Sequence, residues 1–213
     1  MAVITMVVSL ACQSRPPSLP SAAPSAGIRP GTSVLFRFDT STPGPVSEPF
    51  RVLSGSWTIE SDPSAPTPPN VLCGKAAANA PAEITVPAPA FADLTYAVAF
   101  RLSGSGAGSI GLVFRRQNAN SFYLVQAVPV SRSVVIGLQV GDLRRELNSA
   151  LIPFPLGGWQ EFSAQARGSN LSAFLNGQQV AQATDPTNSS GSIGLWIAAG
   201  GAACFDTVQA TGL

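Results

Sequence analysis

Histidine is absent from the 213-residue sequence, and this absence excludes several kinds of catalytic and metal-binding site. Without an imidazole the chain can form neither a Ser-His-Asp nor a Cys-His catalytic arrangement, and it cannot bind zinc through histidine. It also lacks the side chain that most often serves as a base near neutral pH. No other feature of the composition is as restrictive.

Charge is also scarce, because Asp, Glu, Lys and Arg together make up only 11% of the chain. Twelve basic and eleven acidic residues leave a formal net charge of +1. Nucleic-acid binding needs Lys and Arg clustered on one face, and the pairs Arg115-Arg116 and Arg144-Arg145 are too small to provide it. We therefore expect no nucleic-acid partner.

The chain also lacks an apolar run long enough to span a bilayer, which takes about 20 residues. Residues 1–12 form a shorter apolar run of the length of a signal-peptide core, and the Ser9-Leu10-Ala11-Cys12 stretch resembles a lipobox. In a lipobox a signal peptidase cuts before a cysteine that carries diacylglycerol. We expect Cys12 to be lipidated, although an ordinary secretory signal with Cys12 incidental remains an alternative.

Residues 13–32 are rich in Ser, Pro and Ala and poor in large apolar side chains. Such a segment buries too little surface to offset its ordering entropy, so it is expected to be a disordered tether. Together the two segments predict an exported protein of the cell envelope, periplasmic or on the outer surface. Its contact with the membrane would be through the lipid anchor.

From residue 33 to 213 the sequence predicts strands and turns, with no helical period. Tyr96, Val98, Phe100 and Leu102 alternate with smaller or polar residues, which is typical of a half-buried strand. Asn176-Gly177 is the strongest hairpin signal, since both residues tolerate positive φ. The predicted strands are 34–38, 50–53, 56–60, 71–73, 83–86, 95–102, 109–116, 122–128, 133–140, 143–148, 159–166, 171–175, 180–184, 192–197 and 203–210. This pattern predicts an all-β antiparallel sandwich of the jelly-roll kind.

The order of several short motifs resembles one known superfamily. Gly111-Leu112-Val113-Phe114-Arg115 is followed by Asn120-Ser121-Phe122-Tyr123-Leu124-Val125, by Leu175-Asn176-Gly177, by Gly194-Leu195-Trp196 and by Cys204-Phe205-Asp206. The series is similar to the concanavalin A-like lectin/glucanase jelly rolls. In particular it resembles the bacterial domain described as 3-keto-disaccharide hydrolase, which is related to laminin G-type domains.

The resemblance implies a role with carbohydrate, but the architecture serves binding modules and hydrolases alike. Family-sixteen glucanases of this fold carry a Glu-x-Asp-x-x-Glu strand, and that spacing does not occur here. We therefore expect a non-catalytic carbohydrate-binding or adhesive domain. A glycoside hydrolase is the alternative, which would need two carboxyls facing one cleft. A structural protein-interaction module is the third.

Strand alternation points to ligand-binding candidates. Arg115 falls opposite Leu112 and Phe114, and Trp196 falls opposite Ile193, Leu195 and Ile197, so both are expected on an outer sheet surface. An outward tryptophan beside a guanidinium would make a platform for sugar. The alternative is that a loop covers Trp196 and that Arg115 pairs with a structural carboxylate. Further candidates for the same surface are Arg101, Tyr123, Gln126 and Arg145.

Cysteine and aspartate patterns complete the predictions. Cys73 and Cys204 are the two cysteines after Cys12, and in an exported protein they suggest a disulfide rather than two buried thiols. Asp39, Asp185 and Asp206 could in principle hold a calcium ion, but no diagnostic ligand spacing is present, and capping or turn roles are favoured. No cofactor is expected.

Overall fold

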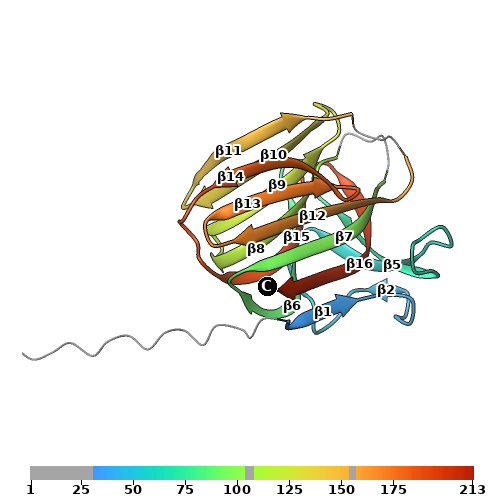
Figure 1. Cartoon of the computed structure of the whole chain (residues 1–213). Coiled ribbons are helices and arrows are strands. Elements are labelled where there is room, and N and C mark those ends of the chain that lie inside the picture. Colours follow the sequence, from blue (N-terminus) through green and yellow to red (C-terminus); the bar gives the residue numbers. More distant parts are fainter. Residues whose placement is uncertain (1–30, 104–107, 154–156) are drawn as a thin grey trace, which may run out of the picture.

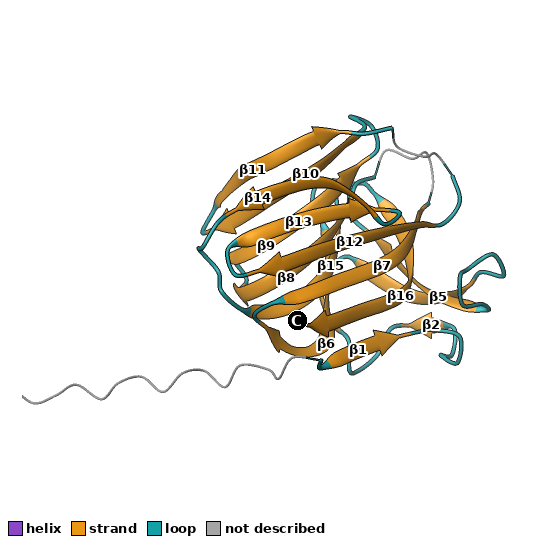
Figure 2. Cartoon of the chain, viewed as in Figure 1, coloured by secondary structure: helices purple, strands orange, loops and turns teal. Residues whose placement is uncertain are grey.

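The computed structural model describes residues 31–103, 108–153 and 157–213 (Figure 1). These residues form two antiparallel sheets packed face to face, and this described part contains no helix, so none that could cross a membrane (Figure 2). The predicted all-β sandwich is confirmed. The predicted signal peptide, Cys12 and nearly all of the tether fall outside the described residues.

The first sheet, sheet A, has nine strands in the order β14-β13-β12-β7-β16-β5-β4-β2, with β1 paired to β16. The strand β16 is long enough to pair with β5 at its start and with β1 near its end. The strands are β1 (Ser33–Phe36), β2 (Gly44–Pro45), β4 (Ser56–Ser61), β5 (Asn70–Lys75), β7 (Leu94–Leu102), β12 (Gln160–Arg167), β13 (Asn170–Leu175), β14 (Gln178–Thr184) and β16 (Ala202–Gly212).

The second sheet, sheet B, has seven strands in the order β11-β10-β9-β8-β15-β6-β3. Its consecutive strands β8 to β11 form a meander, whereas β15 enters between β8 and β6 from far along the chain. The strands are β3 (Arg51–Ser54), β6 (Ala82–Phe91), β8 (Ile110–Asn118), β9 (Ser121–Val128), β10 (Ser133–Val140), β11 (Leu143–Leu151) and β15 (Gly191–Ile197).

The core lies between the inner faces of the two sheets. Tyr96, Val98 and Phe100 of β7 are buried there, as their alternation predicted. Each such large side chain contributes about 1.5–3 kcal/mol of transfer free energy. The Tyr96 hydroxyl crosses the core and donates to the Gly194 carbonyl, 3.1 Å away. Burial raises the pKa of Tyr96 well above its ordinary value, so the hydroxyl stays a donor that ties the two sheets together.

Local sequence explains the turns better than the strand ends. Asn176 and Gly177 both have positive φ, 50° and 77°, and close the predicted β13–β14 hairpin. The strand β6, predicted over 83–86, continues to Phe91 through Pro87 and Pro89. The prolines fall where the register between β6 and β15 is irregular, so their missing N–H groups interrupt no regular ladder.

A disulfide joins two neighbouring strands on the outer face of sheet A. Cys73 of β5 and Cys204 of β16 are directly opposite each other in the ladder, and their sulfurs are 2.06 Å apart. Both cysteines are buried beside Val71 and Ala65, apart from the main core. The bond joins strands that are 131 residues apart in sequence.

Candidate functional site

Trp196 lies on the outer face of sheet B. Its neighbours Leu195 and Ile197 point into the core, so the alternation of β15 places the indole on the opposite side, as predicted. There it packs in a separate apolar cluster whose other members are Val113, Phe122 and Leu124, with Ala198 at the margin. This cluster, the outer platform, is 8% exposed at Trp196 and 7% exposed at Phe122.

Glycines make room for the side chains that cover the outer platform. A Cβ at Gly111 would come within 3.3 Å of the Trp196 ring and 2.6 Å of Leu124, so glycine lets the indole lie down on the sheet. Gly194 faces the same side of β15, two residues from Trp196. Because Gly194 has no side chain, it leaves space above β15 that a bulkier residue would fill.

Two arginines cover the outer platform. The Arg144 guanidinium stands 5.1 Å from the centre of the Trp196 ring, and that of Arg116 stands 4.4 Å from the centre of the Phe122 ring. Arg116 also forms an ion pair with Glu83 of β6. This ion pair crosses over β15 above Gly194, which has no side chain to block it. Arg116 on β8 lies opposite Ser192, and Glu83 on β6 lies opposite Trp196. A cation over an aromatic face is stabilised by the ring quadrupole.

The contact between Arg144 and Trp196 requires a curved sheet. Arg144 is on β11 and Trp196 is on β15, with β10, β9 and β8 between them. Four strand spacings of a flat sheet measure about 19 Å, which these two side chains cannot bridge. The outer face of sheet B is therefore concave, and the outer platform is its floor.

The charges of Arg116 and Arg144 differ in their partners. Arg116 is neutralised by Glu83, whereas the Arg144 guanidinium has no hydrogen bond or ion pair with another described residue. Desolvation lowers the pKa of both groups, but an arginine stays charged at physiological pH. The concave face thus presents a charged guanidinium, that of Arg144, whose five N–H donors are available to a ligand.

Arg115 is not on the sheet surface where strand alternation predicted it. It adopts positive φ, 47°, at a register shift that follows Phe114, and this bulge turns its side chain inward. Only 1% of it is exposed, and it donates to the carbonyls of Ala92, Gly168 and Asn188 and pairs with Asp93. Desolvation lowers the pKa of Arg115 despite Asp93. Its role in the fold is to tie loops together.

Tyr123 and Arg145 also lie away from the outer platform. Tyr123 faces the core, where its hydroxyl donates to Asp185 at 2.7 Å. Arg145 pairs with the same carboxylate at 2.6 Å. Desolvation works against ionisation of Asp185, but the hydrogen bonds from Thr187 and Tyr123 and the Arg145 charge outweigh it and lower its pKa. These contacts are structural.

Gln126 and Arg101 complete the predicted set, and they lie on opposite sheets. Gln126 is opposite Gly111 in the ladder and half-buried beside the outer platform. Arg101 is on β7 of sheet A, where it pairs with Asp62 at 2.6 Å and stacks 5.5 Å from the Trp159 ring. The structure therefore brings together Trp196 and Gln126. Sequence reasoning missed Arg116, Arg144, Glu83 and Phe122.

Two of the three aspartates considered for calcium, Asp185 and Asp206, bind other groups of the protein itself. Asp206 is fully buried and accepts from the Thr67 amide at 2.7 Å and from the Thr67 hydroxyl. Asp185 is engaged as described above. Glu60 lies near the sulfurs of Cys73 and Cys204, but those sulfurs are bonded to each other and are not available to a metal.

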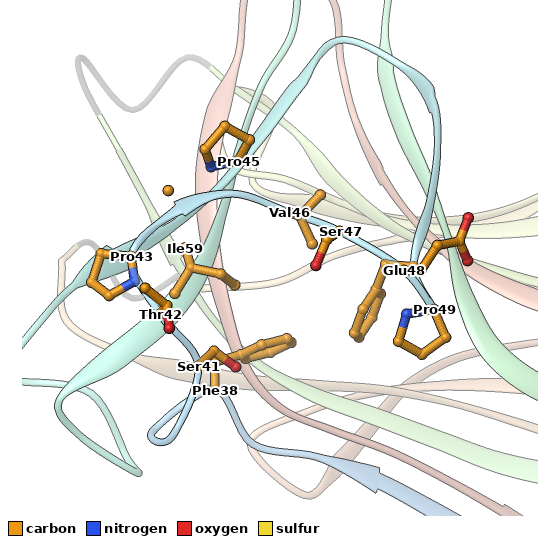
Figure 3. A pocket seen from close by; sticks show the side chains of 12 residues that line it. Phe38, Ser41, Thr42, Pro43, Pro45, Val46, Ser47, Glu48, Pro49 and Ile59 are labelled. Atoms are coloured by element: carbon orange, nitrogen blue, oxygen red, sulfur yellow. The ribbon is translucent and has the colours of Figure 1, made fainter.

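A cavity of about 420 Å³ is lined by the segment 41–50, which includes β2, together with Phe38 and Ile59 of β4 (Figure 3). Phe38, Phe50 and Ile59 form its apolar wall, and the prolines of residues 43–49 form much of its rim. Its single charged lining residue, Glu48, carries a carboxylate that is turned outward in Figure 3. We assign no ligand to it.

Comparison with known folds agrees with the architecture. The carbohydrate binding module CBM66 from Bacillus subtilis is 20% identical, with a TM-score of 0.64 over 76% of this chain and 94% of that one. A protein with a galectin-like fold from Bacillus subtilis is 12% identical, with a TM-score of 0.61 over 84% and 98%. LamA from Z. galactanivorans, solved with laminaritriose and laminaritetraose, is 14% identical, with a TM-score of 0.57 over 86% and 100%.

These likenesses show a concanavalin A-like jelly roll. No curated protein sequence matches the chain. A family model does match, over residues 53–211, which is about three quarters of the chain. The chain belongs to the family of 3-keto-alpha-glucoside-1,2-lyase-like domains.

Proposed function

We propose that this chain is a carbohydrate-binding domain and that its ligand lies on the concave outer face of sheet B. The observation that carries the proposal is the Arg144 guanidinium stacked on Trp196 with no hydrogen-bond or ion-pair partner among the described residues. Sugars offer both an apolar C–H face and a rim of hydroxyls. The indole and Phe122 hold the guanidiniums of Arg144 and Arg116 in place, and Arg144 and Gln126 complement the hydroxyls.

The family and the structural likenesses support a carbohydrate ligand. The family is named for chemistry on a glycoside, and one similar structure is a carbohydrate binding module. A curved sheet with an aromatic floor and a few polar side chains around it is the kind of concavity that such ligands need.

A binding role is favoured over paired-carboxylate hydrolysis. On the concave face Glu83 is held by Arg116, and Glu146 lies five strands away on β11. The Glu146 carboxylate accepts a hydrogen bond from the Ser149 hydroxyl, and glycoside hydrolysis needs two carboxyls about 5–9.5 Å apart in one cleft. Glu83 is therefore better placed to fix Arg116 than to act in a carboxylate pair.

The decisive experiment is a glycan array followed by calorimetry with the glycans that bind. Trp196→Ala should weaken binding at least about tenfold, since it removes the ring that positions the Arg144 guanidinium for the ligand. Phe174→Ala on the outer face of sheet A removes a half-buried aromatic ring and serves as the matched control. Equal affinities for the wild type and for Trp196→Ala would refute the proposal.

A lyase acting at this same face is the second candidate, and Glu83 is the observation in its favour. A 1,2-elimination on a 3-keto-glucoside needs a base that removes the proton at C2 while the group at C1 departs. Glu83 is opposite Trp196 in the ladder and is the carboxylate nearest to it in register. Release of the aglycone from a 3-keto-α-glucoside, lost in Glu83→Gln, would support this reading over simple binding.

The setting of the domain is a further part of the proposal. Export is supported by the apolar start of the sequence and by the Cys73–Cys204 disulfide, because disulfides persist in oxidising compartments. We propose that Cys12 carries the lipid that holds the protein at the cell envelope. Membrane fractionation tests it, since Cys12→Ala should move the protein into the soluble fraction.

A further inference from the structure

A second cavity opens on the opposite side of the sandwich. It has a volume of about 290 Å³ and lies on the outer face of sheet A. Ala97 and Ala99 of β7 form its floor, and Trp159, Glu161 and Gln209 are among the residues around it. The core and sheet B separate this cavity from the outer platform, so the two cannot share one ligand.

The strand β16 departs from regular pairing beside the cavity. The register between β16 and β7 shifts between Asp206 and Gln209, and Thr207 in that interval has φ of 50°. Positive φ is a genuine outlier for a β-branched residue. Strain of this kind costs about 1–3 kcal/mol and persists only where the surroundings enforce it, and such residues cluster at functional sites.

Buried carboxylates enforce the strained conformation and fix the rim. Asp206 accepts from the amide of Thr207 and from Thr67, both at 2.7 Å, which joins the bulge to the segment 62–69. Asp62, at the start of that segment, accepts from Ser64 and pairs with Arg101. The segment is thus tied down at both ends, with Pro66 at the rim of the cavity.

Trp159 supplies the aromatic wall and is itself held in place. Arg101 stacks on the ring at 5.5 Å while it is locked to Asp62. Although desolvation works to raise the pKa of Asp62, hydrogen bonds from Ser64, the Arg101 charge and Trp159 lower it. Trp159 is half-buried, so part of its surface still borders the cavity.

The polar side chains at the mouth of the cavity are available. Glu161 and Gln209 are exposed, and neither side chain forms a hydrogen bond or ion pair with another described residue. Glu161 offers acceptors only, and Gln209 offers both donors and acceptors. Among the described residues no basic side chain lines the cavity, so its chemistry does not suit an anionic ligand.

We propose that this cavity is a second carbohydrate site, which binds a single neutral sugar ring. The ring would lie on the alanine floor against Trp159, with Glu161 and Gln209 taking its hydroxyl groups. The proposal goes beyond the function assigned to the concave face, because it concerns the other sheet and a ligand the size of one residue.

The test is titration with glucose, galactose, mannose and fructose, followed by saturation-transfer NMR and calorimetry. The protein is Trp196→Ala, in which the concave face is disabled, or Arg144→Ala if the first variant does not fold. Binding of one of these sugars should persist in that protein. Adding Ala99→Leu, which fills the floor, should weaken it at least tenfold, whereas Ser172→Leu elsewhere on the same face should not.

The outcomes separate this proposal from the one for the concave face. If Trp196→Ala removes all binding of the monosaccharides, or if Ala99→Leu has no effect, the second site is refuted and the concave face is untouched. If Ala99→Leu reduces monosaccharide binding while glycan affinity does not depend on Trp196, only the second site stands. Glu161→Gln adds a graded check, since an amide keeps the shape but weakens acceptance from hydroxyls.

Discussion

Each outer face of this sandwich carries an arginine stacked on a tryptophan, and the two stacks differ in what holds the arginine. On sheet A, Arg101 over Trp159 is fixed by Asp62 at 2.6 Å and by the Ser64 hydroxyl at 2.9 Å. On sheet B, Arg144 over Trp196 has neither kind of partner among the described residues.

The difference teaches how the same contact can serve two purposes. A guanidinium whose donors are already used stiffens its surroundings, and here it holds the wall of a cavity. A guanidinium that is positioned by an aromatic ring alone keeps its donors for a ligand. An arginine stacked on a tryptophan therefore does not by itself indicate a binding site. Whether the arginine can bind a ligand depends on whether its donors already have hydrogen-bond partners.

The largest change would come from cutting the covalent tie on sheet A. Replacing Cys73 and Cys204 by alanine should lower the free energy of unfolding by about 3–5 kcal/mol, because the bond closes a long loop. Glycan affinity at the concave face should not change. Denaturant unfolding and calorimetry measure the two effects, and a loss below about 1 kcal/mol would mean that the sheet does not depend on the bond.

Removing the fixed arginine should cost stability and leave the concave face intact. Arg101→Ala leaves the Asp62 carboxylate, which is only 7% exposed, without its ion-pair partner, and should lower the free energy of unfolding by about 1–3 kcal/mol. Chemical denaturation measures this loss. The double variant with Asp62→Asn should recover part of it, and no recovery would argue against the pair.

Removing the unpartnered arginine should do the reverse. Arg144→Ala should change the free energy of unfolding by no more than about 0.5 kcal/mol, as for most surface substitutions. It should weaken glycan binding about tenfold, which corresponds to about 1.4 kcal/mol. Isothermal titration measures the affinity, and an Arg144→Ala protein that binds normally but melts early would reverse the roles assigned to the two stacks.

The smallest effect should appear in acid. Desolvation works to raise the pKa of Asp62 and of Asp185. The hydrogen bonds and arginine charges at the two carboxylates outweigh it and hold both pKa values below the ordinary 3.8. A lowered folded pKa gives stability that is present above the unfolded value and is lost as pH falls through the folded value. Unfolding followed from pH 6 to about pH 2 should show this loss, and Asp62→Asn should flatten the curve.

Adjacent arginines show why strand phase could be predicted only in part. In the pairs Arg115-Arg116 and Arg144-Arg145, sequence reasoning selected the first of one and the second of the other. The structure places Arg116 and Arg144 on the outer platform instead. At the first pair a bulge inverted the alternation. At the second pair, Arg145 lies opposite Leu138 of β10, which points into the core, so Arg145 shares the inner side of the sheet. That pairing is not visible in the sequence.

The sequence by itself determined the class of fold and the face of Trp196. Period-two alternation, the Asn176-Gly177 turn and the absence of histidine act locally or through composition, so they can be read without coordinates. Tertiary structure decided which charged groups are satisfied. Glu83, Arg116 and Arg144 come from strands far apart in the chain, and only the curvature of sheet B brings them over one platform. Whether a guanidinium is locked or available depends on such distant partners.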